Sequence, residues 1–161
     1  MRVITRAAFL AAAAIPLSVA APALASAADA DDVSFAYAVD GSTVTNTITN
    51  NSETPLTCAT SLGLAPGGGL PPVDVILSGG QSFYDQGVVA PGTTTQVVTD
   101  VPDGSYVVLA SCGSDGSNPS MWVSDYPGIE GYLSVLPYTS YVVQQASAVV
   151  TISGPVLSPP A

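Results

Sequence analysis

The stretch from residue 100 to residue 112 has the most informative pattern of apolar and polar positions in this chain. It begins with a Pro-Asp-Gly sequence that is typical of a tight turn and continues as an apolar run. A strand here would place four side chains on one face: Tyr106, Val108, Ala110 and Cys112. The opposite face, with Val107 and Leu109, is also apolar. The pattern therefore predicts a strand that is covered on both sides.

The part of the chain before this stretch also predicts strands. Residues 33–39 alternate between apolar and polar, Asp40-Gly41 is a two-residue hairpin signal, and the threonine-rich residues 43–49 form the return strand. A strand around Cys58 follows, in which this cysteine shares an inward face with two leucines. We also expect strands at 73–77 and 93–99, separated by loops.

The part after this stretch predicts strands at 121–124, 132–136 and 141–152, with the last one bent near its middle. No window shows sustained helical periodicity. Short strands with frequent Gly, Pro and Asn indicate an all-β fold, a sandwich or a barrel. We place this β-domain at 33–152, between an acidic, loose leader at 28–32 and a proline-rich tail at 153–161.

The first 27 residues resemble a signal peptide. Arg2 and Arg6 precede an apolar run at 7–19, and Ala25-Ser26-Ala27 fits the small-x-small cleavage pattern. The run is too short for a comfortable membrane span. We therefore expect a secreted protein, extracellular or in the cell envelope, without a membrane span after cleavage.

Charge narrows the possible partners. The chain has twelve acidic residues, no histidine and a net charge of −10, and its two basic residues both lie in the expected signal peptide. Cleavage would leave a net charge of about −12, from side-chain counting alone. A surface of this kind repels nucleic acids and other polyanions, so nucleic-acid binding is excluded.

The two cysteines predict one disulfide. Paired cysteines in an exported chain favour a bridge, and both Cys58 and Cys112 fall on the inward faces of expected strands. We expect this bridge to pin the β-core. Closing a loop of about 55 residues would stabilise the fold by roughly 4 kcal/mol on the chain-entropy model.

The residues that most enzymes use for proton transfer are missing. Without His or Lys the mature chain has no Ser-His, Cys-His or Ser-Lys pair. Neither Asp-Thr-Gly nor Asp-Ser-Gly occurs, which argues against an aspartic protease. A carboxylate pair of the glycosidase type is an open alternative. Most aspartates lie beside Gly, Pro or Ser in expected turns, so we expect no enzyme and no catalytic residue.

Metal and cofactor sites are not expected either. Transition metals need His or clustered Cys. Calcium takes oxygen ligands, and residues 29–32 and 115–118 are the candidates, although solvated turns explain both segments better.

Aromatic residues crowd into one part of the chain. Within twenty residues lie one tryptophan and four tyrosines: Trp122, Tyr126, Tyr132, Tyr138 and Tyr141. Such side chains fill cores, but they also bind partners. Tyr126 and Tyr138 are next to Pro in expected loop tips, so we expect them to be exposed. Trp122, Tyr126 and Tyr138 are therefore the candidate partner-binding residues.

Two stretches resemble immunoglobulin-like β-sandwiches of secreted actinobacterial proteins. These are T-V-T-N-T-I-T-N-N-S-E-T-P-L-T-C at 43–58 and A-P-G-T-T-T-Q-V-V-T-D-V-P-D-G-S-Y-V-V at 90–108. The resemblance implies a single antiparallel sandwich of about seven to nine strands and a tyrosine corner at Tyr106. Two features depart from antibody-type domains: Cys112 lies six residues after Tyr106 rather than two, and Trp122 follows both cysteines.

Fold resemblance implies little about activity. We expect a non-enzymatic interaction or ligand-binding domain whose partner is a protein, a neutral glycan or a small molecule. One alternative is a small-molecule carrier similar to the acidic neocarzinostatin-type apoproteins, although their two short-range disulfides cannot form from two cysteines. The other is a carboxylate-based glycan hydrolase.

The composition makes one direct prediction. Because residues 28–161 contain no Lys or Arg, the mature chain should survive trypsin even when it is reduced and unfolded. Mass spectrometry of the digest should show one intact chain. Fragments of the denatured mature protein would contradict the expected cleavage position.

Overall fold

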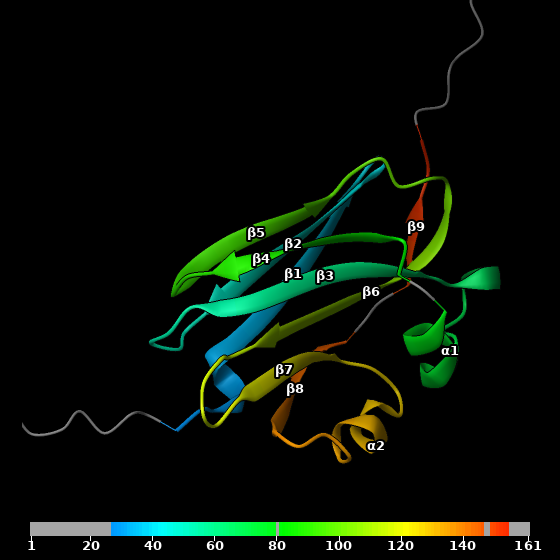
Figure 1. The fold of residues 1–161 in the computed structure, drawn as a ribbon. Coiled ribbons are helices and arrows are strands. Elements are labelled where there is room, and N and C mark those ends of the chain that lie inside the picture. Colours follow the sequence, from blue (N-terminus) through cyan, green and yellow to red (C-terminus); the bar gives the residue numbers. More distant parts are fainter. Residues whose placement is uncertain (1–26, 80, 147–148, 155–161) are drawn as a thin grey trace, which may run out of the picture.

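The strands of this chain lie in two facing sheets (Figure 1), as seen in a computed structural model that describes residues 27–79, 81–146 and 149–154. The smaller sheet has the antiparallel order β1-β2-β5, and the larger has the order β4-β3-β6-β7-β8, with β9 also paired to β6. The strands are β1 (Val33–Asp40), β2 (Thr43–Asn50), β3 (Leu56–Leu64), β4 (Phe83–Val89), β5 (Gly92–Val98), β6 (Gly104–Gly113), β7 (Ser120–Asp125), β8 (Thr139–Ala146) and β9 (Val149–Ile152). The fold is therefore mostly β, as the sequence predicts.

Short helices join these strands. They are the 3₁₀ turns η1 (Ala30–Asp32) and η2 (Pro66–Gly68) and the α-helices α1 (Val73–Ser78) and α2 (Ile129–Leu133). The predicted strands at 73–77 and 132–136 are therefore wrong, and β4 lies between residues 77 and 93, where we expect no strand. A short apolar run does not distinguish a strand from a single helical turn. Here Pro72 precedes α1, and only Ile76 of that helix is buried.

Strand β6 lies at the centre of the larger sheet. One edge pairs with β3 from Leu64↔Tyr106 to Thr57↔Gly113. The other edge is shared, because β9 pairs with its first half and β7 with its last three residues. The expected single strand at 141–152 is thus two strands: β8 runs parallel to β7, and β9 pairs with β6 directly.

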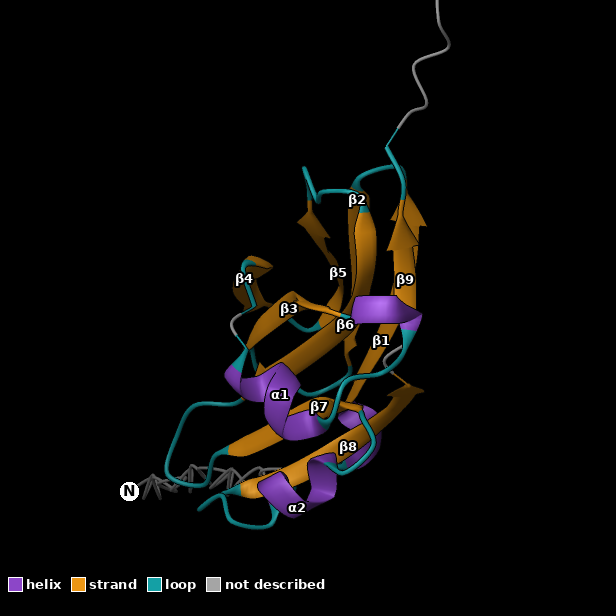
Figure 2. Cartoon of the chain, turned by 90° about the vertical axis from the view of Figure 1, so that its right-hand side faces the viewer, coloured by secondary structure: helices purple, strands orange, loops and turns teal. Residues whose placement is uncertain are grey.

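Both faces of β6 are buried, as predicted. One face points into the space between the sheets, and its four side chains are at most 3% exposed: Tyr106, Val108, Ala110 and Cys112. On the other face, Val107 and Leu109 are covered by an apolar cluster that includes Ile76 of α1 and Ile129 of α2. Figure 2 shows both helices on this side of the larger sheet. The helices therefore form a third layer, which the sequence did not predict.

The disulfide joins Cys58 to Cys112 as predicted. These residues are direct partners on the neighbouring strands β3 and β6, with Cα atoms 4.0 Å apart. The bridge therefore lies within one sheet, facing the inter-sheet core, and does not connect the two sheets.

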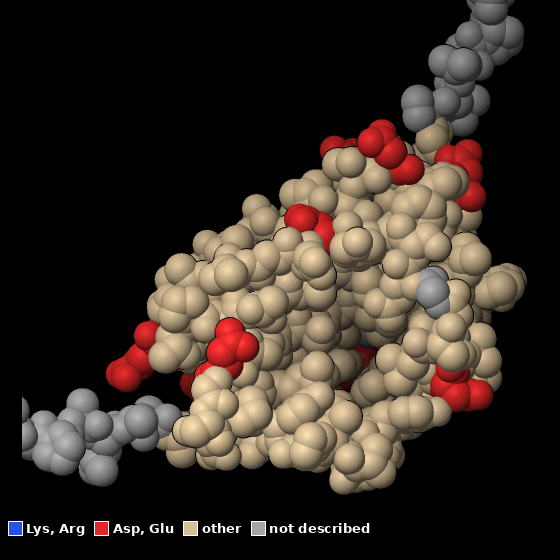
Figure 3. Space-filling view, viewed as in Figure 1, with Lys and Arg blue, Asp and Glu red and all other residues tan. Residues whose placement is uncertain are grey.

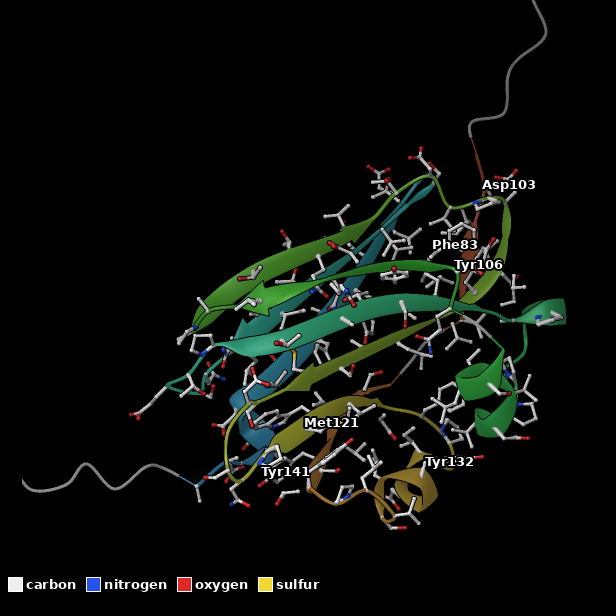
Figure 4. All side chains as sticks on the ribbon, in the orientation of Figure 1. Phe83, Asp103, Tyr106, Met121, Tyr132 and Tyr141 are labelled. Carbon is white, nitrogen blue, oxygen red and sulfur yellow. A yellow bond between two sulfur atoms is a disulfide. The ribbon has the colours of Figure 1, made fainter. Side chains whose placement is uncertain are left out.

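Tyr106 forms a corner at one end of the sandwich. Its hydroxyl donates a 3.0 Å hydrogen bond to the Pro102 carbonyl, and its ring meets Phe83 edge-on with centroids 6.0 Å apart. The nearby Asp103 carboxylate accepts from the Gly154 N–H at 2.6 Å, just after β9. Figure 4 shows these side chains together. The hydrogen bond from the Tyr106 hydroxyl to upstream backbone, which the resemblance implies, is therefore confirmed.

A row of polar side chains crosses the space between the sheets. We call it the polar belt: Tyr37, Asn46, Thr60, Gln96 and Ser124. Tyr37, Asn46 and Gln96 are aligned partners across β1, β2 and β5. Thr60 comes from β3, and Ser124 comes from β7. The belt lies between two apolar clusters, one around Cys58 and Trp122 and one around Leu62 and Val108.

Hydrogen bonds within the belt connect the two sheets. The Asn46 amide donates to the Thr60 hydroxyl at 2.8 Å, and that hydroxyl donates to the Gln96 side-chain oxygen at 2.7 Å. The Gln96 amide donates to the Cys58 carbonyl at 2.9 Å. Separately, Ser124 Oγ accepts from the Ala110 N–H at 3.0 Å. Because buried polar groups must be paired, these bonds favour one alignment of the sheets.

Tyr37 gives the belt a measurable pH dependence. Burial raises the pKa of its hydroxyl to about 12, and an interaction with Ser124 lowers it by a smaller amount. Between about pH 10 and 12 the unfolded chain loses this proton and the folded chain keeps it. Stability should therefore fall with rising pH in that window, by at most about 1.4 kcal/mol per pH unit from this group. Tyr37→Phe should remove this pH dependence, and it should also remove the step near pH 12 from a phenolate absorbance titration of the folded protein. If the substitution instead removed a step near pH 10, the assignment would be wrong.

Gly63 marks where α1 packs against β3. A Cβ at this position would lie 2.9 Å from Ile76 Cγ1 and closer still to Cδ1. Ile76 is 4% exposed and cannot move freely. Gly63→Ala should therefore lower the free energy of unfolding by about 1–3 kcal/mol, measured by denaturant titration. Gly87→Ala is the matched control, because an added Cβ there meets nothing within 4 Å. Equal effects of the two substitutions would contradict the close packing.

Candidate binding site

Trp122 belongs to the core. It is 1% exposed on β7, and its ring stacks on that of Tyr141 with centroids 5.6 Å apart and planes inclined by 23°. Its indole N–H donates to the Asp29 carbonyl at 2.7 Å. This candidate is therefore not available to a partner on the surface.

Tyr126 is also buried, so its expected exposure at a loop tip is wrong. Only 2% of it is exposed, because the segment between β7 and α2 folds over the outer face of the larger sheet. Its hydroxyl donates to the Pro71 carbonyl, just before α1. Burial raises the pKa of this hydroxyl. Tyr126 thus connects the two helices of the third layer.

Tyr138 is the one candidate that stays partly exposed. It lines a groove of about 520 Å³ between α2 and β8. Leu133, Leu136 and Val142 supply apolar walls, and Ser134 and Ser140 supply hydroxyls. Glu130, at the first turn of α2, supplies the single charge among the lining residues. We call this the α2–β8 groove.

The α2–β8 groove exists because successive side chains of β8 point to opposite faces of the larger sheet. Val142 packs toward the helical layer, and Val143 belongs to the inter-sheet core. Tyr141 also packs against that core. Sequence reasoning missed the groove because it did not predict α2, which begins in the expected loop and ends inside the expected strand at 132–136. The spacing of Ile129, Tyr132 and Leu133 fits one helical turn and is the signal that could have indicated it.

A second hollow lies on the other side of β8. It has a volume of about 310 Å³ and opens between β8 and β1, which we call the β1–β8 hollow. Val33, Phe35 and Val143 line its apolar part, and Asp31 is the charged residue at its wall. Val142 lines both hollows.

The acidic leader forms one wall of the β1–β8 hollow. We expected residues 28–32 to be loose, but they are anchored to the domain. The Tyr141 hydroxyl donates to the Ala28 carbonyl at 2.6 Å, and Asn51 donates its backbone N–H to the Asp32 carbonyl at 2.7 Å. These bonds hold the leader against β8 and against the end of β2.

The charged side chains of the described residues are all acidic. Figure 3 shows separate red groups on one face of the molecule and no blue. Several carboxylates accept backbone N–H groups: Asp85 accepts from Val97 at 2.9 Å, and Asp29 and Asp32 form a capping box at η1. These aspartates therefore have structural partners.

The structure does not support a metal centre at the two calcium candidates. Within the described part of the chain, no three Asp, Glu, Cys or His residues are grouped so that they could hold a metal. Residues 29–32 use carboxylates to cap a turn, and residues 115–118 form an exposed loop.

Comparisons with protein-family models, curated proteins and solved structures find no match to this chain. None of the helices in residues 27–79, 81–146 and 149–154 has the length and hydrophobicity needed to cross a bilayer.

Proposed function

We propose that this chain is an exported, non-enzymatic binding domain with an immunoglobulin-like sandwich fold, and that it binds its partner at the α2–β8 groove. The observation that carries the proposal is the composition of that groove. Apolar walls, the Tyr138 ring, two serine hydroxyls and Glu130 converge on about 520 Å³. Binding sites commonly combine apolar surface with a few polar groups in this way.

Two features support the immunoglobulin-like part of the proposal. Two sheets face each other across an apolar core, and the Tyr106 hydroxyl bonds to backbone four residues upstream. The in-sheet disulfide and the helical layer distinguish this chain from antibody-type domains. The disulfide also fits an oxidising compartment outside the cytoplasm.

The absence of catalysis is supported by residue chemistry. The described residues contain no His, Lys or Arg to act with a nucleophile. Asp29, Asp32, Asp85 and Asp103 bond to backbone N–H groups and so act as caps and braces. Among the residues that line the α2–β8 groove, Glu130 is the only carboxylate, and a glycosidase needs two.

Charge restricts the ligand. A groove that carries Glu130 on an acidic protein favours neutral or cationic groups over anionic ones. Both hollows beside β8 open to solvent, which suits an interaction surface better than the enclosed site of a carrier.

The proposal can be tested by NMR titration of the labelled protein with a neutral glucan hexasaccharide and, separately, with tryptamine. At least one probe should shift the amide signals of Ser134, Tyr138 and Ser140. Tyr138→Ala should weaken that binding at least fivefold, because it removes an aromatic contact worth about 1 kcal/mol. Tyr84→Ala, at a tyrosine that is 60% exposed on β4, is the matched control.

Two results would contradict the proposal. If the NMR signals changed only at residues on other surfaces, the α2–β8 groove would not be the binding site. Release of shorter sugars from the hexasaccharide, abolished by Glu130→Gln, would show an enzyme instead.

A further inference from the structure

We infer that β8 docks an extended, basic segment of another polypeptide by strand addition. This inference rests on the proposed function and names the class of partner. It starts from the position of β8 at the end of the larger sheet. Among the described residues, β8 pairs only with β7, and β1 opposite it pairs only with β2. An open strand edge is a template for a further strand.

The opposite side of the sandwich shows what a protected edge looks like in this chain. There β4 and β5 contact each other, as β1 and β8 do on the β8 side. The difference is that the Asp85 carboxylate accepts the Val97 N–H at 2.9 Å. This side chain occupies a donor on the outer edge of β5 that an incoming strand would need. In β8, by contrast, no side chain of the described residues forms a hydrogen bond with a backbone N–H or C=O group of residues 139–143.

The two hollows beside β8 match the geometry of an added strand. Successive side chains of a strand point to opposite faces of the sheet. A strand paired with β8 would therefore direct every second side chain into the β1–β8 hollow, toward Phe35 and Val143. The intervening side chains would enter the α2–β8 groove, near Tyr138 and Glu130. Val142, which lines both hollows, marks the edge between them.

Charge complementarity identifies the occupant. Each hollow has one acidic residue in its lining, Asp31 in the first and Glu130 in the second. The described residues have no basic side chain to neutralise either. A second copy of this chain would bring another dozen carboxylates and be repelled. The structure therefore favours a partner segment in which apolar residues alternate with lysine or arginine.

The probe is an eight-residue peptide, acetyl-(Val-Lys)₄-amide, titrated into the labelled full-length mature protein. We expect shifts and slowed amide exchange at residues 139–143, and weaker binding as salt is added. The control peptide, acetyl-Val₄-Lys₄-amide, has the same composition and charge but no alternation. It should bind at least fivefold more weakly than the alternating peptide.

Two N-methylated forms of the peptide test strand addition without altering the protein. Backbone N–H groups of alternate residues point to opposite edges of a strand. Methylating all valine nitrogens blocks one edge, and methylating all lysine nitrogens blocks the other. Strand addition requires one form to lose at least tenfold in affinity, through several lost hydrogen bonds, while the other form retains binding. Equal effects of the two forms would overturn the inference.

Glu130→Gln tests the charge argument. It should weaken binding of the alternating peptide about two- to fivefold, the range for an exposed ion pair. Glu53→Gln, in the turn between β2 and β3, removes the same charge elsewhere and should have no effect. If both variants lost the same amount of affinity, the attraction would depend only on the net charge of the protein, and the docking site would be overturned.

The outcomes separate this inference from the proposed function. Binding of the hexasaccharide or tryptamine in the α2–β8 groove, without any peptide binding, overturns strand addition and leaves the binding domain intact. Failure of all three probes overturns both.

Discussion

The constraint on which this structure depends is the burial of both faces of one strand, β6. Strand β6 has apolar residues on both faces, so each face must be covered. The smaller sheet covers one face, and α1, α2 and the segment through Tyr126 cover the other. Its backbone must be satisfied as well, because buried N–H and C=O groups need partners. Strands β3, β7 and β9 supply these partners on its two edges.

The polar belt adds specificity to this apolar arrangement. Apolar contacts alone tolerate small shifts of one sheet against the other, because dispersion and burial have little directionality. The bonds from Asn46 to Thr60 and from Gln96 to the Cys58 carbonyl tolerate them poorly. A one-residue slip of β2 would turn Asn46 outward and point a threonine into the core. The belt therefore penalises alternative alignments by leaving buried polar groups unpaired.

Much of the β-structure could be predicted from the sequence because alternation is a local signal. Residues 33–49 show it. The Pro-Asp-Gly turn before β6 is a local signal of another kind, and Tyr106 just after it donates its hydroxyl to the Pro102 carbonyl as expected. The helices could not be predicted in the same way. Each is a short segment with one fully buried residue, Ile76 in α1 and Ile129 in α2, and both residues pack on a surface that only the folded sheet creates. The burial of Tyr126 has the same cause.

The candidate site was predicted only in part. Tyr138 does lie at an accessible position, but its neighbours come from α2 and β8, and only tertiary structure brings these together. Trp122 is held inside by the leader, whose carbonyl at Asp29 satisfies its indole. A long-range bond of this kind leaves no pattern in the local sequence. The two-cysteine composition predicts the bridge, but only the register of β3 and β6 places it within a sheet.

One edge of β6 pairs with both β7 and β9, which come later in the chain, and this affects the order in which the chain can fold. A nascent chain that ends before residue 104 has all of the smaller sheet but lacks β6, β7, β8 and β9 of the larger one. Phe35 and Ile48 then have no β6 or β7 residues to cover them. Ile152, in the last strand, completes the buried cluster around Val108. Stable structure therefore waits for almost the whole chain, and the early strands must be kept from aggregating until it arrives.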